Sequence, residues 1–167
     1  DFNIDLVIYS ATKFLGGHSD LIAGCVSGSN ELLSQIKGTR TFFGSTADPH
    51  TCWLLLRSLE TLKIRMEEQA RSAKKVAEFL KNHDRIEKVY FLDYLDGKQK
   101  EIFDQQCLSA GSMISFDIKS TKEDSFKFLD KLELITLAVS LGSTESLIQH
   151  PWSMTHYSMD ERTKTIL

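Results

Sequence analysis

The feature that most constrains the fold is an amphipathic stripe in the middle of the chain. Asp48 followed by Pro49 is a typical helix start, with aspartate as the N-cap and proline at the first helical position. Apolar residues then recur at spacings of three or four, at Leu55, Leu59, Leu62, Met66, Ala70, Ala73, Ala77 and Leu80. Charged residues occupy mostly the other faces. The pattern predicts one long helix with an apolar packing side and a solvated side.

Apolar runs before this helix predict strands. Residues 6–9 form a continuous run of β-forming residues, which is typical of a strand covered on both faces. Residues 21–26 form a second run that ends at a turn. A short helix is predicted over 30–36, capped by its own first residue and followed by Gly38 as the residue after its end. A flexible stretch is expected over 39–47.

The segments after the long helix alternate between strand and helix patterns. Strands are predicted over 86–91, 112–118 and 135–139, and a helix over 122–132. The polar residues 93–106 are expected to form a loop with some helix. This order predicts a small α/β domain behind the long helix.

We therefore predict an α/β fold in two parts. Residues 1–66 form the first part and include the start of the long helix, and residues 67–167 form an incomplete small domain. The chain opens on Asp1 and stops after Leu167 without a cap or loop. We expect it to be a segment, truncated at both ends, of a longer protein.

Composition excludes several classes of protein. The 167 residues include 20 basic and 23 acidic side chains, a net charge of −3, so the basic excess of a nucleic-acid-binding protein is absent. No apolar stretch approaches the length of a membrane span. Cys25, Cys52 and Cys107 are far apart and odd in number, which predicts buried, reduced thiols and a reducing compartment, the cytoplasm. His150 and His156 lack a supporting ligand pattern, so no metal site is predicted.

Residues that can carry chemistry cluster directly after the first predicted strand. Lys13 follows a buried strand among small residues, and desolvation there would make its amine nucleophilic toward a carbonyl. Ser10 and Thr12 are two apart, so in extended chain both hydroxyls could hold one anion. Gly16 and Gly17 allow close backbone approach. Such a set suits a phosphorylated aldehyde such as pyridoxal phosphate; the alternative is an ordinary lysine at a strand end.

Residues 5–19 resemble the lysine motif of the Cys/Met-metabolism (transsulfuration) family of pyridoxal-phosphate enzymes, D-L-x-x-x-S-A-T-K-F-L-x-G-H-S. Residues 56–66 are similar to that family's long-helix segment, and residues 137–142, 145–148 and 150–156 to its substrate-carboxylate region. The resemblance covers nearly the entire chain. It implies a fold-type-I transferase, in which residues 1–66 are the C-terminal part of the cofactor-binding large domain.

The resemblance also implies roles for individual residues. Lys13 would be the Schiff-base lysine and the base that moves protons between substrate carbons. Ser10 and Thr12 would bind the cofactor phosphate. Ser140 would contact the α-carboxylate of the substrate, with Thr155 nearby.

A further position bears on the substrate. Family members that handle cystathionine usually have a glutamate directly before the carboxylate-binding serine, and here that residue is Val139. An apolar side chain suits methionine or an activated homoserine ester. The resemblance therefore implies γ-elimination or γ-replacement, by a methionine γ-lyase-like or homoserine-sulfhydrylase-like enzyme. Cystathionine γ-lyase and cystathionine γ-synthase are the alternatives.

The resemblance implies a small-molecule amino-acid substrate and a homotetramer built as a dimer of dimers. The family's aspartate at the cofactor ring nitrogen and its carboxylate-binding arginine are expected outside residues 1–167. This segment alone should then be inactive or nearly so. A hypothesis from another class is that the chain is only a scaffold or packing domain.

Overall fold

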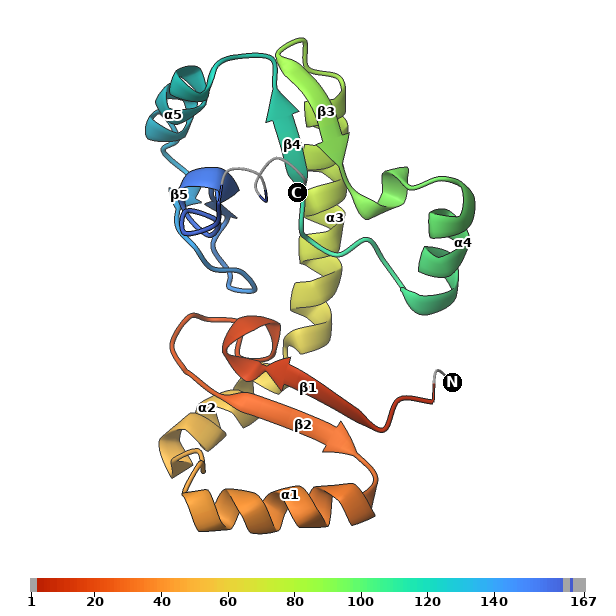
Figure 1. The fold of residues 1–167 in the computed structure, drawn as a ribbon, viewed down its shortest axis with the longest axis vertical. Coiled ribbons are helices and arrows are strands. Elements are labelled where there is room, and N and C mark those ends of the chain that lie inside the picture. The colour runs from red at the N-terminus through yellow and green to blue at the C-terminus, as the bar shows by residue number, and fades with distance from the viewer. Residues whose placement is uncertain (1–2, 161–162, 164–167) are drawn as a thin grey trace. The chain divides into compact units, whose positions relative to one another are not determined.

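The computed structural model describes residues 3–160 and residue 163 (Figure 1). Two compact units make up the described chain. The first contains the described residues up to Leu62 together with those from Ala138 onward, and the second contains residues 63–137. Helices and strands occur in both, as an α/β chain requires. The predicted division between residues 66 and 67 stays a prediction about the domains of a complete protein.

The first unit begins with a two-stranded ribbon. Strand β1 (Leu6–Ser10) pairs antiparallel with β2 (Gly24–Gly28), and one wide helical turn, η1 (Ala11–Leu15), follows β1 directly. The expectation that this first strand is covered on both faces is wrong, because Ile8 is 79% exposed. Among the described residues β1 has only β2 beside it in its sheet, so an apolar run alone did not reveal which layer covers it.

Helix α1 (Asn30–Phe43) is longer than predicted. Its N-cap is Ser29, whose hydroxyl accepts a backbone N–H of the first turn, and its end is Gly44, with a left-handed φ of +74°. The prediction that the helix stops before Gly38 is wrong. A single glycine inside a helix costs only about 1 kcal/mol, which the surrounding turns outweigh, whereas the left-handed conformation at Gly44 ends it.

The predicted long helix is divided into α2 (Pro49–Leu59) and α3 (Leu62–Lys81). The Asp48 carboxylate accepts two backbone N–H groups of the first turn, which confirms the predicted start. The prediction of one unbroken helix is wrong at residues 60–61. There the backbone N–H and the hydroxyl of Thr61 both donate to the Ser58 carbonyl at 3.3 Å, and such local bonding competes with the regular helix.

The second unit is built on α3 and an antiparallel pair of strands, β3 (Ile86–Tyr90) and β4 (Ser115–Ile118). Both strands lie within the predicted segments. In Figure 1 the two strands run beside α3. The core contains two alanines of α3 and residues from three later segments, namely Ala73, Ala77, Phe91, Phe103 and Ala110. The short alanine side chains let aromatic rings approach the helix closely.

The remaining elements of this unit are short. Part of the predicted loop is ordered as η2 (Leu92–Tyr94) and α4 (Gly97–Gln106). Helix α5 (Lys122–Asp130) confirms the predicted helix, and β5 (Thr136–Leu137) lies within the last predicted strand. After β5 the chain continues in the first unit to β6 (Leu147–Ile148) and η3 (Pro151–Ser153).

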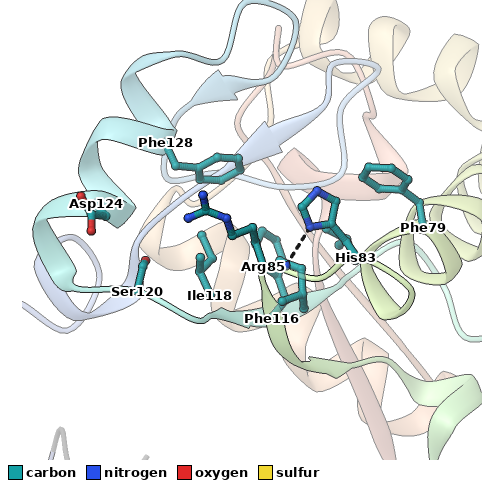
Figure 2. A pocket seen from close by; sticks show the side chains of 10 residues that line it. Phe79, His83, Arg85, Phe116, Ile118, Ser120, Asp124 and Phe128 are labelled. Carbon is teal, nitrogen blue, oxygen red and sulfur yellow. Dashed lines mark hydrogen bonds between the residues drawn. The ribbon is translucent and has the colours of Figure 1, made fainter.

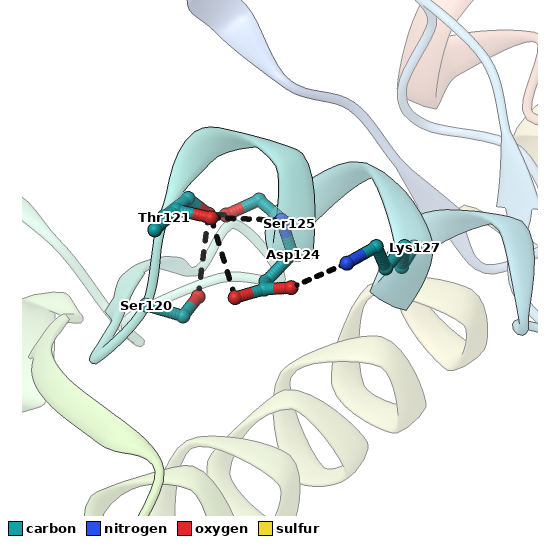
Figure 3. Close-up of polar contacts among 5 residues, drawn as sticks. All are labelled: Ser120, Thr121, Asp124, Ser125 and Lys127. Carbon is teal, nitrogen blue, oxygen red and sulfur yellow. Dashed lines mark hydrogen bonds and ion pairs between the residues drawn. The ribbon is translucent and has the colours of Figure 1, made fainter.

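Polar side chains define the start of α5 (Figure 3). The Thr121 hydroxyl accepts the backbone N–H of Asp124 at 3.3 Å, and Lys127 donates to the Asp124 carboxylate at 2.9 Å. The hydrogen bond from Lys127, its charge, and the Thr121 hydroxyl together lower the pKa of Asp124 below 3.8. This cluster satisfies a helix terminus, so its chemistry is structural.

The cysteine prediction is wrong in one respect. Cys25, Cys52 and Cys107 are all free thiols, but each is exposed. They lie on a strand face, in the first turn of α2 and just after α4, where none of the described elements covers them. Within the described ranges, no helix is long and apolar enough to cross a membrane.

Candidate active site

The first unit brings together two predicted site residues that are 127 positions apart in the sequence. Lys13 lies in η1 with backbone angles of φ −87° and ψ −123°, which are not helical, and its side chain is half-buried. Its Nζ donates a hydrogen bond to Oγ of Ser140, at 3.4 Å, from the loop between β5 and β6. An amine and a hydroxyl from distant parts of the sequence therefore meet at one place in the first unit.

The loop that carries Ser140 presses directly on the backbone of the lysine turn. Gly142 has a left-handed φ of +88°. A Cβ atom on Gly142 would lie 2.6 Å from the backbone nitrogen of Phe14 and 2.7 Å from the carbonyl carbon of Lys13. Only glycine fits this contact. In the sequence, the only indication of this contact was that Gly142 stands two residues after the candidate Ser140.

A histidine links the lysine turn to other elements of the unit. His18 Nδ1 lies 2.7 Å from the carbonyl oxygen of Gly16 and 3.4 Å from Oγ of Ser58, a buried residue of α2. On the loop after Ser140, hydrogen bonding from Ser143, with a smaller electrostatic contribution from His18, lowers the pKa of Glu145 below its ordinary value of 4.5. The sequence had placed this histidine in a motif but had given it no role.

The two predicted phosphate-binding hydroxyls lie differently. Ser10 is exposed at the end of β1. The Thr12 hydroxyl accepts the N–H of Ala23 at 3.0 Å and donates to the carbonyl of Ala23 at 3.4 Å. The premise that Ser10 and Thr12 share one extended segment is wrong, because the chain turns into η1 at Ala11.

The predicted residues nearer the C-terminus make local contacts. The Val139 side chain, next to Ser140, is 54% exposed. The Thr155 hydroxyl donates to the carbonyl of Pro151 at 3.5 Å and lies 3.0 Å from Nδ1 of His156. The placement of Thr155 at a substrate stays a prediction. In the part of the chain that the structure describes, no group of three histidine, cysteine or acidic residues could hold a metal ion.

The donors present fit a phosphorylated aldehyde. Lys13 offers an amine beside a hydroxyl, and Ser10 offers an exposed hydroxyl three residues earlier, at the end of β1. Thr12 could redirect its hydroxyl proton toward a phosphate at small cost, since its present bond of 3.4 Å is at the long end for a hydroxyl donor. The roles of Lys13, Ser10 and Thr12 at pyridoxal phosphate stay predictions.

A cavity of about 290 Å³ lies in the second unit (Figure 2). Its lining residues fall between positions 79 and 128, and none of them is a predicted site residue. Its walls come from α3, β3, β4 and α5 and include Phe79, Phe116 and Phe128. The side chain of Arg85 extends toward Phe128, and its backbone N–H donates to Nδ1 of His83 at 3.1 Å. Most of its exposed surface is apolar, and the polar residues at its wall are His83, Arg85, Ser120 and Asp124.

A lysine amine beside a serine hydroxyl, on an α/β scaffold, suits an enzyme that uses a lysine in amino-acid chemistry. The chain belongs to the family of Cys/Met metabolism PLP-dependent enzymes, whose family model matches residues 1–166. This confirms the predicted family and its cofactor, pyridoxal phosphate.

Named relatives agree with this assignment. The chain is 43% identical over 166 residues to L-methionine gamma-lyase of Porphyromonas gingivalis, covering 97% of this chain and 42% of that protein. It is 37% identical over 167 residues to cystathionine beta-lyase MetC of Bacillus subtilis, covering 98% and 43%. The crystal structure of cystathionine gamma synthase from Xanthomonas oryzae pv. oryzae in complex with cystathionine is 36% identical, with a TM-score of 0.91 over 99% of this chain and 43% of that one. The chain thus spans less than half the length of these relatives.

Proposed function

We propose that this chain is the lysine-bearing part of a pyridoxal-phosphate enzyme that performs γ-elimination or γ-replacement on methionine or a homoserine-derived substrate. The observation that carries the proposal is the hydrogen bond from Lys13 Nζ to Ser140 Oγ. It unites the residue that would hold the cofactor with the residue that would bind the substrate carboxylate. Membership of the family supports both roles.

Each site residue of this chain would have its own role in the reaction. When bound, pyridoxal phosphate supplies an electron sink for negative charge at the substrate α-carbon. Lys13 Nζ would take the proton from that carbon and return it elsewhere on the substrate, and a positioned base of this kind contributes about 10²–10⁴-fold in rate. The Ser140 hydroxyl would donate to the α-carboxylate and so orient the α-carbon toward Nζ. Ser10 and Thr12 would hold the phosphate.

The preference for methionine or a homoserine ester rests on Val139. Its exposed side chain stands beside Ser140 and offers an apolar contact without a countercharge for a distal amino group. Similarity to methionine gamma-lyases supports the same choice. The second candidate is a cystathionine enzyme, favoured by the likeness to solved structures of cystathionine gamma synthase and cystathionine gamma-lyase.

The complete enzyme would be a cytoplasmic homotetramer in which this chain forms less than half of each subunit. The segment alone would be inactive or nearly so. The exposed apolar residues of its first unit, such as Ile8, Ile22 and Phe42, support a need for further covering chain. The non-catalytic scaffold stays the alternative of another class.

The test of the proposed function is a substrate comparison on the complete enzyme. We expect higher kcat/KM for methionine or O-acetylhomoserine than for cystathionine. Val139→Glu should move the ratio toward cystathionine by about tenfold, the value of one hydrogen bond to a charged group. Val76→Glu, at another exposed valine of the chain, is the matched control and should leave the ratio unchanged. A clear preference of the unmodified enzyme for cystathionine would contradict the argument from Val139.

A further inference from the structure

We infer that Gly142 is a positioning residue: its backbone contact with the lysine turn sets the spacing between the Lys13 amine and the Ser140 hydroxyl. This deepens the proposed function and rests on it for the meaning of that spacing. The contact itself is a property of the first unit alone, so it can be tested independently of any activity.

The contact joins the backbone of Gly142 to the backbone of the lysine turn, so no side chain can rotate away to relieve a clash. The nearest neighbours of a Cβ on Gly142 would be the nitrogen of Phe14, at 2.6 Å, and the carbonyl carbon of Lys13, at 2.7 Å. A flexible side chain could move away from such an atom, but the backbone of η1 is itself held. The N–H of Gly17 donates to the carbonyl of Lys13, and that of Gly16 to the carbonyl of Ala11, both at 2.7 Å. An added methyl group must therefore displace the loop.

The position of Gly142 makes that displacement matter. It lies two residues after Ser140, so a shift of the loop backbone moves the serine away from Nζ of Lys13. Their hydrogen bond, at 3.4 Å, already lies near the long limit. A further shift of a few tenths of an ångström would break it.

A separate contact holds the lysine turn on its other side. His18 Nδ1 lies 2.7 Å from the carbonyl oxygen of Gly16 and 3.4 Å from Oγ of Ser58, a buried residue of α2. The turn against which Gly142 packs is thus also tied to α2 through His18.

The decisive comparison is Gly142→Ala against Gly111→Ala. Both glycines have left-handed φ values, +88° and +69°, so both variants carry the backbone cost of alanine there. A Cβ on Gly111 meets nothing within 4 Å, so only Gly142→Ala adds the clash. The first measurement is amide hydrogen exchange at Gly17 in the chain without cofactor. We expect Gly142→Ala to speed this exchange by about tenfold or more and Gly111→Ala to leave it within about twofold.

The second measurement separates positioning from general destabilisation. In the complete enzyme, Gly142→Ala should raise KM for the amino-acid substrate by about tenfold, while borohydride still traps the cofactor on Lys13. In a Ser140→Ala background the same change should add less than about twofold to KM, because its effect passes through the serine. Equal KM for Gly142→Ala and Gly111→Ala, or full additivity with Ser140→Ala, would overturn the inference.

A variant outside the contact covers the case in which Gly142→Ala does not fold. His18→Ala removes the contacts with Gly16 and Ser58 that hold the lysine turn, so it should raise KM in the same direction. His18→Asn keeps a donor near the position of Nδ1 and should restore KM. Unchanged KM in His18→Ala would also overturn the inference. If no cofactor is trapped on Lys13 even in the unmodified enzyme, the proposed function fails, while the exchange measurement still decides whether Gly142 holds the two segments together.

Discussion

Replacing Thr12 by valine removes a hydroxyl that joins the lysine turn to the start of β2. The hydroxyl accepts the N–H of Ala23 at 3.0 Å and donates to the carbonyl of the same residue at 3.4 Å. Valine has nearly the same shape but can do neither. The backbone bond from the N–H of Thr12 to the carbonyl of Ala23, at 3.2 Å, remains, so the change isolates the side chain.

The expected loss of stability in Thr12→Val follows from the backbone group of Ala23 that loses its partner. The N–H of Ala23 loses its acceptor in a half-buried place, and one net hydrogen bond with partial desolvation is worth about 1–2 kcal/mol. This corresponds to roughly a 5–30-fold change in an opening equilibrium. Thr12→Ser is the matched control, because it keeps the hydroxyl and loses one half-buried methyl group, worth about 0.4 kcal/mol or about twofold.

The assay is amide hydrogen exchange at Ala23, followed by nuclear magnetic resonance. Protection should fall by roughly 5–30-fold in Thr12→Val and by no more than about twofold in Thr12→Ser. Unchanged protection in Thr12→Val, or equal loss in both variants, would refute the assignment of this hydroxyl to Ala23. The same pair of variants then shows in the complete enzyme whether the hydroxyl also serves the cofactor phosphate, since only valine should weaken cofactor binding.

Three further predictions concern the stability of the chain. Thr121→Ala should destabilise α5 by about 1 kcal/mol through loss of its N-cap, seen as faster amide exchange in the first turn. Because the folded pKa of Glu145 lies below 4.5, its ionised form stabilises the fold above that pH, and this contribution disappears as the pH falls through the lowered pKa. Glu145→Gln should therefore reduce the fall of the unfolding free energy with falling pH, measured by urea titration at several acidic pH values. An unchanged dependence on pH would contradict this. Ala77→Leu, at a fully buried position of α3, should cost about 1–3 kcal/mol by overpacking, whereas exposed Val76→Leu should stay within about 0.5 kcal/mol; equal urea midpoints would contradict the core assignment.

The sequence was most informative where a local signal had no competitor. Asp48 and Pro49 predicted a helix start correctly because a capping carboxylate and a fixed φ act within a few residues. The division at Thr61 could not be predicted, since it depends on whether a hydroxyl bonds the Ser58 carbonyl instead of solvent. The same limit applies to Gly38 and Gly44, because a glycine ends a helix only where the backbone turns left-handed.

The candidate site shows a similar division. The residue types of the lysine motif indicated Lys13, and the resemblance added Ser140, but neither could show that Nζ and Oγ lie 3.4 Å apart. The contact of Gly142 with the backbone of Phe14 depends on how two distant segments pack. Burial was the least predictable property. The apolar run of β1 and the three cysteines suggested buried side chains, but burial depends on a further layer of structure, and the described residues do not include one there.

The measurement that tests the central claim most directly is the site of cofactor attachment. The complete enzyme is incubated with pyridoxal phosphate, reduced with borohydride, digested, and its peptides are sequenced by mass spectrometry. The account predicts that the stable modification lies on Lys13 and is lost in Lys13→Arg. A modification on a different lysine with Lys13 unmodified, or none at all, would contradict it.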